Sequence, residues 1–78
     1  DIYIAIIHYK GEDVSDSIRV VMARADYKIK SKTSRGELNE LAMEVNVKND
    51  NFSFSDKLKA IDGVQEVTLI QYDGEYHG

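Results

Sequence analysis

The apolar positions of this chain repeat with a period of two in some segments and of three to four in others. Residues 2–9 form a nearly continuous apolar run rich in β-branched side chains, which is typical of a strand at the centre of a sheet. Residues 27–33 and 38–48 alternate between apolar and polar positions and predict a half-buried antiparallel hairpin. Residues 64–72 alternate again and predict a last strand.

The segment after the first strand carries apolar residues at helical spacing. Val14, Ile18 and Met22 fall on one side of a helix of period 3.6, which predicts that this side packs on the sheet. The side chain of Asp13 is expected to cap the helix by accepting hydrogen bonds from its first N–H groups. Asp16 adds negative charge to the first turn, where the helix dipole favours it.

A second, shorter helix is predicted before the last strand. Residues 54–61 carry a short apolar stripe, and Ser53 with Asp56 resembles a capping box in which Asp replaces the usual Glu or Gln. Gly63 follows the stripe at the position where a left-handed helix cap is expected.

The predicted order is therefore β-α-β-β-α-β, the ferredoxin-like arrangement of the α+β class. It implies a four-stranded antiparallel sheet with the first and third strands central and two helices on one face. The core is expected to contain Ile4, Ile6, Ile18, Val21, Met22, Ile29, Leu41, Met43, Val45, Leu58, Ile61, Val67 and Leu69.

Three lysines alternate with less polar residues along the second predicted strand. Lys28, Lys30 and Lys32 are expected to share the side of the sheet that the helices leave open. Lysines on an outer strand protect its free edge against pairing with other chains. The alternative is that they contact an anionic ligand or anionic lipid headgroups.

Length and charge restrict the class of protein. The 78 residues suffice for one domain spanning residues 1–78. Acidic side chains outnumber basic ones 14 to 10, so no nucleic-acid partner is expected. There is no cysteine for a metal site or a disulfide, and no apolar run approaches the ~20 residues of a membrane span. Because a strand pattern begins directly after Asp1, without an initiator Met, we expect a domain excised from a longer protein.

Two glycine-containing segments carry a family resemblance. Residues 9–14, a glycine loop from strand to helix, together with residues 61–67 resemble the ACT-like regulatory domains, which commonly bind small ligands, often amino acids, where two copies meet. With the Tyr-Asp-Gly-Glu-Tyr segment at residues 72–76, the chain is similar to the soluble C-terminal domain of a family of bacterial membrane proteins of unknown function. The resemblance implies a non-catalytic regulatory or self-association domain on the cytoplasmic side of the membrane.

The loop after the first strand is the candidate ligand site, formed by Lys10, Gly11, Glu12 and Asp13. It joins a central strand to a helix N-terminus, where backbone N–H groups and the helix dipole favour an anion. Its own carboxylates oppose that preference with an effect of similar size. The sequence therefore leaves two alternatives open: a small-ligand or anion-sensing domain, or a domain that acts without a ligand.

The last strand is the candidate self-association site, through Val67, Leu69 and Ile70. An outer strand with β-branched residues and no proline pairs readily with another chain, so the expected partner is a second copy. Self-association would serve a regulatory role, or the domain would be a structural cap that sets the oligomeric state of its parent protein. His8 with nearby carboxylates offers a catalytic alternative, but the sequence predicts no catalytic residues, no metal site and no cofactor.

Overall fold

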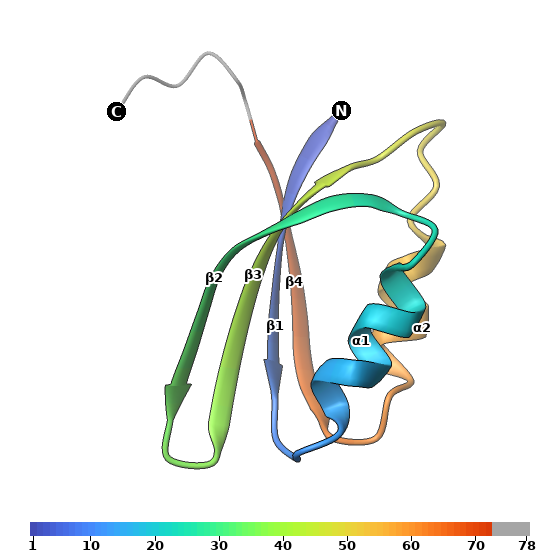
Figure 1. Ribbon diagram of the computed structural model, residues 1–78. Coiled ribbons are helices and arrows are strands. Elements are labelled where there is room, and N and C mark those ends of the chain that lie inside the picture. Colours follow the sequence, from blue (N-terminus) through green and yellow to red (C-terminus); the bar gives the residue numbers. More distant parts are fainter. Residues whose placement is uncertain (73–78) are drawn as a thin grey trace.

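Six elements follow one another in the predicted order. The computed structural model describes residues 1–72 (Figure 1). Its elements are β1 (Ile2–Tyr9), α1 (Val14–Met22), β2 (Asp26–Arg35), β3 (Leu38–Asn46), α2 (Ser53–Lys59) and β4 (Val64–Gln71). Neither helix of this described part has the length and apolar content that a membrane span requires. The Tyr-Asp-Gly-Glu-Tyr segment begins at Tyr72, and its other residues lie outside the described part.

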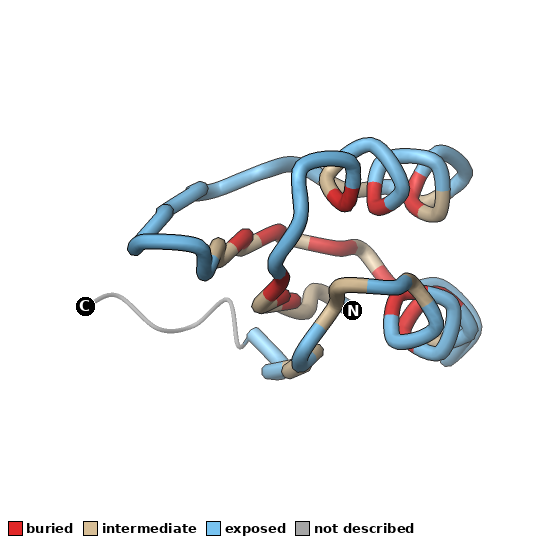
Figure 2. The backbone as a smooth tube through the Cα atoms, turned by 90° about the horizontal axis from the view of Figure 1, so that it is seen from below, coloured by how far each residue is buried: buried red, intermediate tan, exposed pale blue. Residues whose placement is uncertain are grey.

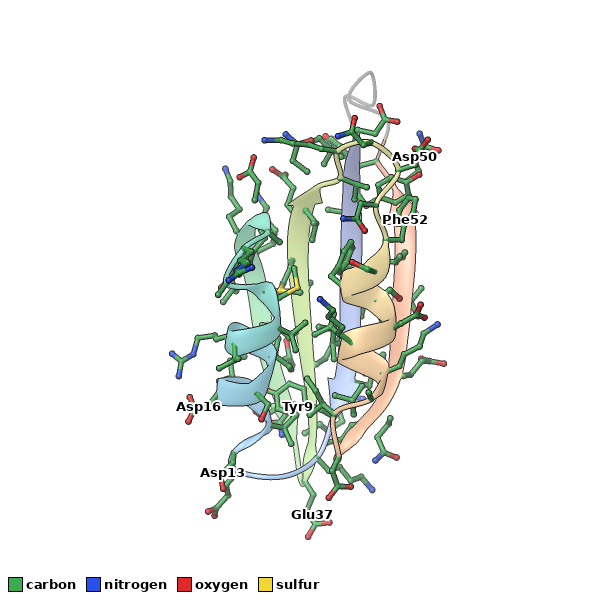
Figure 3. All side chains as sticks on the ribbon, turned by 90° about the vertical axis from the view of Figure 1, so that its right-hand side faces the viewer. Tyr9, Asp13, Asp16, Glu37, Asp50 and Phe52 are labelled. Atoms are coloured by element: carbon green, nitrogen blue, oxygen red, sulfur yellow. The ribbon has the colours of Figure 1, made fainter. Side chains whose placement is uncertain are left out.

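The strands form one antiparallel sheet in the order β2-β3-β1-β4, so β1 and β3 are central, as predicted. Both helices lie over the same face of the sheet (Figures 1 and 3). We call this the helix face and the opposite side the open face. The ferredoxin-like architecture expected from the sequence is confirmed.

The predicted core was wrong in the phase of β1. Ala5, Ile7 and Tyr9 point toward the helices and are at most 2% exposed, whereas Ile4 and Ile6 are partly exposed on the open face. Because β1 is apolar at nearly every position, its sequence contains no alternation that shows which residues face inward. Only its register with the neighbouring strands decides the phase.

The remaining core agrees more closely with the sequence pattern. Buried as predicted are Ile18, Met22, Leu41, Met43, Val45 and Leu58, while Val21, Ile61, Val67 and Leu69 pack against them with partial exposure. Val14 is buried on the helix side that was predicted to pack on the sheet, and Val47 and Phe54 are also buried, although they were not among the predicted core residues. Ile29 is 51% exposed, contrary to the prediction, because β2 is an outer strand whose residues are almost all exposed (Figure 2).

A β-bulge divides the predicted row of lysines. The pairing of β2 with β3 shifts between Ile29 and Ser31, so Lys28 lies opposite Glu44 but Lys32 lies opposite Leu41. Directly opposed residues share a face, and an extra residue in one strand moves the following side chains to the other face. Since Leu41 is buried on the helix face, Lys32 is on that face and Lys28 is on the open one. The single lysine face was therefore a wrong prediction.

The helix starts also differ from the predicted caps. Asp13 precedes α1, but its side chain makes no capping hydrogen bond. The N–H groups of the first turn therefore have no hydrogen bond to this side chain. At α2, Ser53 is the first helical residue rather than the cap. The N-cap residue is Phe52, which makes no side-chain capping hydrogen bond. One position earlier, Asn51 Oδ1 accepts a 3.1 Å hydrogen bond from the Ser53 N–H.

Candidate functional site

The loop between β1 and α1 is held by the turn that precedes β4. The carbonyl of Gly63 accepts a 2.9 Å hydrogen bond from the Lys10 N–H. Gly63 has φ +102°, and a Cβ there would lie 2.4 Å from the Lys10 carbonyl oxygen. Because α2 already ends at Lys59, Gly63 is not the predicted helix cap. It is required because two backbone segments approach each other closely.

Gly11 gives the loop its turn. Its φ of +118° is a conformation that residues with a Cβ rarely adopt, and a Cβ would come within 3.0 Å of Val14 Cγ2. The turn leaves Lys10 and Glu12 exposed on either side of Gly11. These side chains are thus directed away from the core by the backbone itself.

The loop forms one wall of a groove of about 710 Å³, which we call the loop groove. The other wall is the β2–β3 hairpin, at the end of the molecule where Figure 3 shows Tyr9 and Glu37. The volume lies within the range of roughly 300–1,000 Å³ that is usual for small-molecule sites. The groove is lined by Tyr9, Lys10, Gly11, Glu12, Ser15, Lys32, Ser34, Gly36, Glu37 and Asn39.

The sequence identified only part of this groove. Lys10, Gly11 and Glu12 line it as predicted, whereas Asp13 does not. The residues from the hairpin were missed, above all Lys32, which reaches the groove because the bulge turns it to the helix face. No local sequence signal shows a bulge in a strand of alternating lysines.

Charges of both signs meet in the loop groove. Lys10 and Lys32 face the same space as Glu12 and Glu37, and within residues 1–72 no ion pair joins any of these four. These side chains can therefore bind both ends of a ligand that carries an ammonium and a carboxylate group.

Neutral polar groups complete the floor of the loop groove. The Ser34 hydroxyl donates a 2.6 Å hydrogen bond to Asn39 Oδ1. The Asn39 Nδ2 donates in turn to the Tyr9 carbonyl oxygen at 3.4 Å. These bonds fix the amide of Asn39 between the hairpin and β1, so its orientation is set before any ligand binds.

His8 belongs to a separate cluster on the open face. Its Nε2 lies 2.8 Å from Glu40 Oε1, and its Nδ1 lies 3.3 Å from Glu66 Oε1. The two ring nitrogens of His8 thus each face one carboxylate, and the two carboxylates come from the strands on either side of β1. This cluster lies outside the loop groove, and no three metal-binding side chains of the described chain are arranged to hold an ion.

The three predicted self-association residues do not share a surface. Val67 lies opposite Ile7, and with Leu69 it faces the helices and packs against the core. Ile70 lies opposite Ile4 on the open face and is 50% exposed. Of the three, Ile70 is the most exposed, and β4 as a whole is an outer strand.

No protein-family model matches the sequence, and no curated protein matches it either. Solved structures do match. The crystal structure of the ACT domain from GTP pyrophosphokinase of Chlorobium tepidum has a TM-score of 0.73 at 19% identity, covering 88% of this chain and 96% of that one. The solution NMR structure of that ACT domain has a TM-score of 0.70 at 18% identity, covering 100% of this chain and 94% of that one.

These identities are low, so the likeness concerns the fold. It extends over both helices and all four strands of the chain. The fold of this chain is therefore ACT-like, as the two glycine-containing segments of its sequence indicated.

Proposed function

We propose that this chain is a non-catalytic regulatory domain that binds a small zwitterionic molecule, such as an amino acid, in the loop groove. The observation that carries the proposal is the meeting of two lysines and two glutamates around hydrogen-bonding groups in a groove of suitable volume. The fold supports the proposal, because it matches the ACT domain from GTP pyrophosphokinase. The ACT-like regulatory domains that the sequence resembles commonly bind small ligands, often amino acids.

Lys32 changes the electrostatic balance of this site. The α1 N-terminus favours an anion by about 0.3–1 kcal/mol, and an exposed carboxylate such as Glu12 opposes it by a similar amount. Lys32 adds a cation that the loop sequence alone does not contain. The carboxylate of a ligand would lie toward Lys10, Lys32 and the uncapped first turn, and its ammonium toward Glu12 and Glu37.

Binding in this groove would connect two parts of the fold. One wall is the β1–α1 loop and the other is the β2–β3 hairpin, which includes the outer strand β2. A ligand that contacts both walls restrains their relative motion and stabilises the folded state by mass action. That restraint is a direct way to transmit ligand binding to attached domains.

A thermal-shift screen with amino acids, nucleotides, polyphosphate and divalent cations tests the proposal. We expect an amino acid to raise the melting temperature saturably, by roughly 4–8 °C for each kcal/mol that the ligand adds to the free energy of unfolding. Lys32→Glu should abolish the shift, whereas Lys28→Glu, on the same strand but the open face, should retain it. A shift that survives Lys32→Glu, or no shift with any compound, would contradict the proposal.

Self-association is a second candidate function, because the two outer strands differ in protection. β2 carries three lysines and a bulge, whereas β4 (Val64–Gln71) has Glu66 as its one charged residue. An outer strand with so little charge is prone to pair with a second copy. On the open face, Ile70 of β4 lies opposite Ile4 of β1, and with Ile6 on the same face of β1 these residues would extend an apolar contact.

Attachment to a membrane protein is a further part of the proposal, supported by the sequence resemblance alone. The domain would then lie on the cytoplasmic side of a bacterial membrane and report ligand binding to the parent chain. Protease accessibility in inverted and right-side-out vesicles containing the parent protein tests this. Digestion of the domain only in right-side-out vesicles would contradict a cytoplasmic position.

A further inference from the structure

A second groove lies at the opposite end of the molecule from the loop groove. Its volume is about 340 Å³, and it is bounded by the end of α1, the beginning of α2 and the end of β3. Figure 3 shows this end of the two helices near Phe52 and Asp50. We call it the helix-end groove; it is lined by Val21, Arg24, Ala25, Asp26, Val45, Asn46, Val47, Lys48, Asn51, Ser53, Phe54 and Lys57.

The charge of this groove is opposite to that of the whole chain. Arg24, Lys48 and Lys57 line it, while Asp26 is the one acidic residue among its described lining. The chain as a whole has a net charge of −4. Within residues 1–72, none of the three cations forms an ion pair, and Asp26 Oδ2 already accepts a 3.4 Å hydrogen bond from Asn46 Nδ2.

Three separate elements bring these cations together. Arg24 follows α1, Lys48 follows β3 and Lys57 lies in α2. Like charges that converge on one concave surface repel one another, and they raise the local concentration of anions. In a protein with an excess of carboxylates, most basic side chains can find an acidic neighbour. Three basic side chains that line one groove without an ion pair in the described part of the chain therefore favour the binding of an anion there.

The floor of the groove is apolar. Val45, Val47 and Phe54 are buried and form this floor together with the partly exposed Val21 and Ala25. Its water-accessible apolar area comes mainly from Val21 and Ala25, because Val45, Val47 and Phe54 are at most 9% exposed, and an inorganic anion would leave that area in contact with water. A ligand with an apolar part would cover it and gain free energy from its burial.

We infer that the helix-end groove binds a small organic anion, namely a carboxylate or phosphate joined to a compact apolar group. The anionic group contacts Arg24, Lys48 and Lys57, and the apolar group lies on Val21 and Ala25. This site is independent of the loop groove, because the two share no residue. An experiment can therefore disprove ligand binding in one groove without affecting the proposal for the other.

An NMR titration of the ¹⁵N-labelled chain tests the inference, with phenyl phosphate, benzoate, inorganic phosphate and benzyl alcohol as probes. We expect phenyl phosphate or benzoate to shift the amide signals of Val45, Val47 and Phe54 saturably, and the tighter of the two identifies the anionic group. Inorganic phosphate should bind more weakly, and the neutral alcohol should cause no saturable shift. Absence of a saturable shift with both organic anions, or shifts confined to Lys10 and Gly11, would overturn the inference.

Two charge reversals on one helix provide a matched comparison. Lys57 lines the groove, whereas Lys59 is an exposed residue of the same helix that does not. Lys57→Glu should weaken binding of the organic anion about tenfold or more, and Lys59→Glu less than about twofold. The reason is that a charge in direct contact with the ligand interacts with it more strongly than a surface charge that solvent and salt screen. Equal effects would overturn the inference. If Lys57→Glu does not fold, Lys48→Gln replaces it and should also weaken binding.

Discussion

Gly63 and Lys10 connect the turn before β4 to the loop after β1. The Gly63 carbonyl accepts a 2.9 Å hydrogen bond from the Lys10 N–H, and a Cβ at Gly63 would lie 2.4 Å from the Lys10 carbonyl oxygen and 2.6 Å from Val14 Cγ2. The loop that forms one wall of the loop groove is thus positioned by backbone contact with a distant segment. A side chain at position 63 cannot be accommodated without moving that loop.

Gly63→Ala is therefore expected to cost about 3 kcal/mol or more, because it combines a positive φ with a clash against backbone. Gly36→Ala is the matched control. Gly36 also has a positive φ, +62°, but open space surrounds its missing Cβ, so about 1–2 kcal/mol is expected. Urea unfolding of both variants measures the difference. Equal costs would show that the close approach at Gly63 is relaxed easily.

The phase of β1 gives a second prediction. Ile7 is fully buried under the helices, and Ile7→Ala should destabilise the domain by about 2–5 kcal/mol. Ile4 is partly exposed on the open face, so Ile4→Ala should cost about 1 kcal/mol. Denaturant midpoints of the two variants test this. A larger loss of stability for Ile4→Ala than for Ile7→Ala would mean that the open face of β1 is covered.

Sequence patterns predicted the order of elements and the strand positions well, because the amphipathic helices and β3 have one clear apolar side. Leu41, Met43 and Val45 are buried as their alternation indicates. The phase of β1 was not predictable from its own residues, since both of its faces are apolar. It depends on pairing with β3 and β4, which is a property of the folded sheet.

The candidate site shows the same limit. The loop residues Lys10, Gly11 and Glu12 were identified because a strand-to-helix turn with glycine is a local pattern. Lys32 was assigned to the wrong face because one extra residue in β2 reverses every side chain that follows it. Pairing between distant segments therefore decides which charges enter the groove.

His8 gives a prediction of small effects. Glu40→Gln should destabilise the domain by less than about 1 kcal/mol, because partly exposed ion pairs contribute little. Glu66→Gln should cost less still, since its contact with His8 is longer, 3.3 Å against 2.8 Å, and its side chain is more exposed. Thermal unfolding of both variants provides the comparison. A loss of several kcal/mol at either position would indicate a more deeply coupled cluster.

Self-association through β4 is tested by two similarly exposed isoleucines. Ile70 on β4 is 50% exposed and Ile29 on β2 is 51% exposed, and both strands are outer strands. We expect the chain to associate at tens of micromolar, Ile70→Lys to be monomeric, and Ile29→Lys to behave like the parent. Analytical ultracentrifugation measures this. A monomeric parent chain, or equal behaviour of both variants, would argue against association through β4.

The central claim is that a zwitterionic ligand binds in the loop groove, and amide NMR tests it most directly. The ¹⁵N-labelled chain is titrated with each common amino acid in turn. We predict that at least one of them shifts the amide signals of Gly11, Lys32 and Gly36 together, because these residues line both walls of the groove. Spectra that stay unchanged with every amino acid, or shifts that leave all three of these amides unaffected, would contradict the claim.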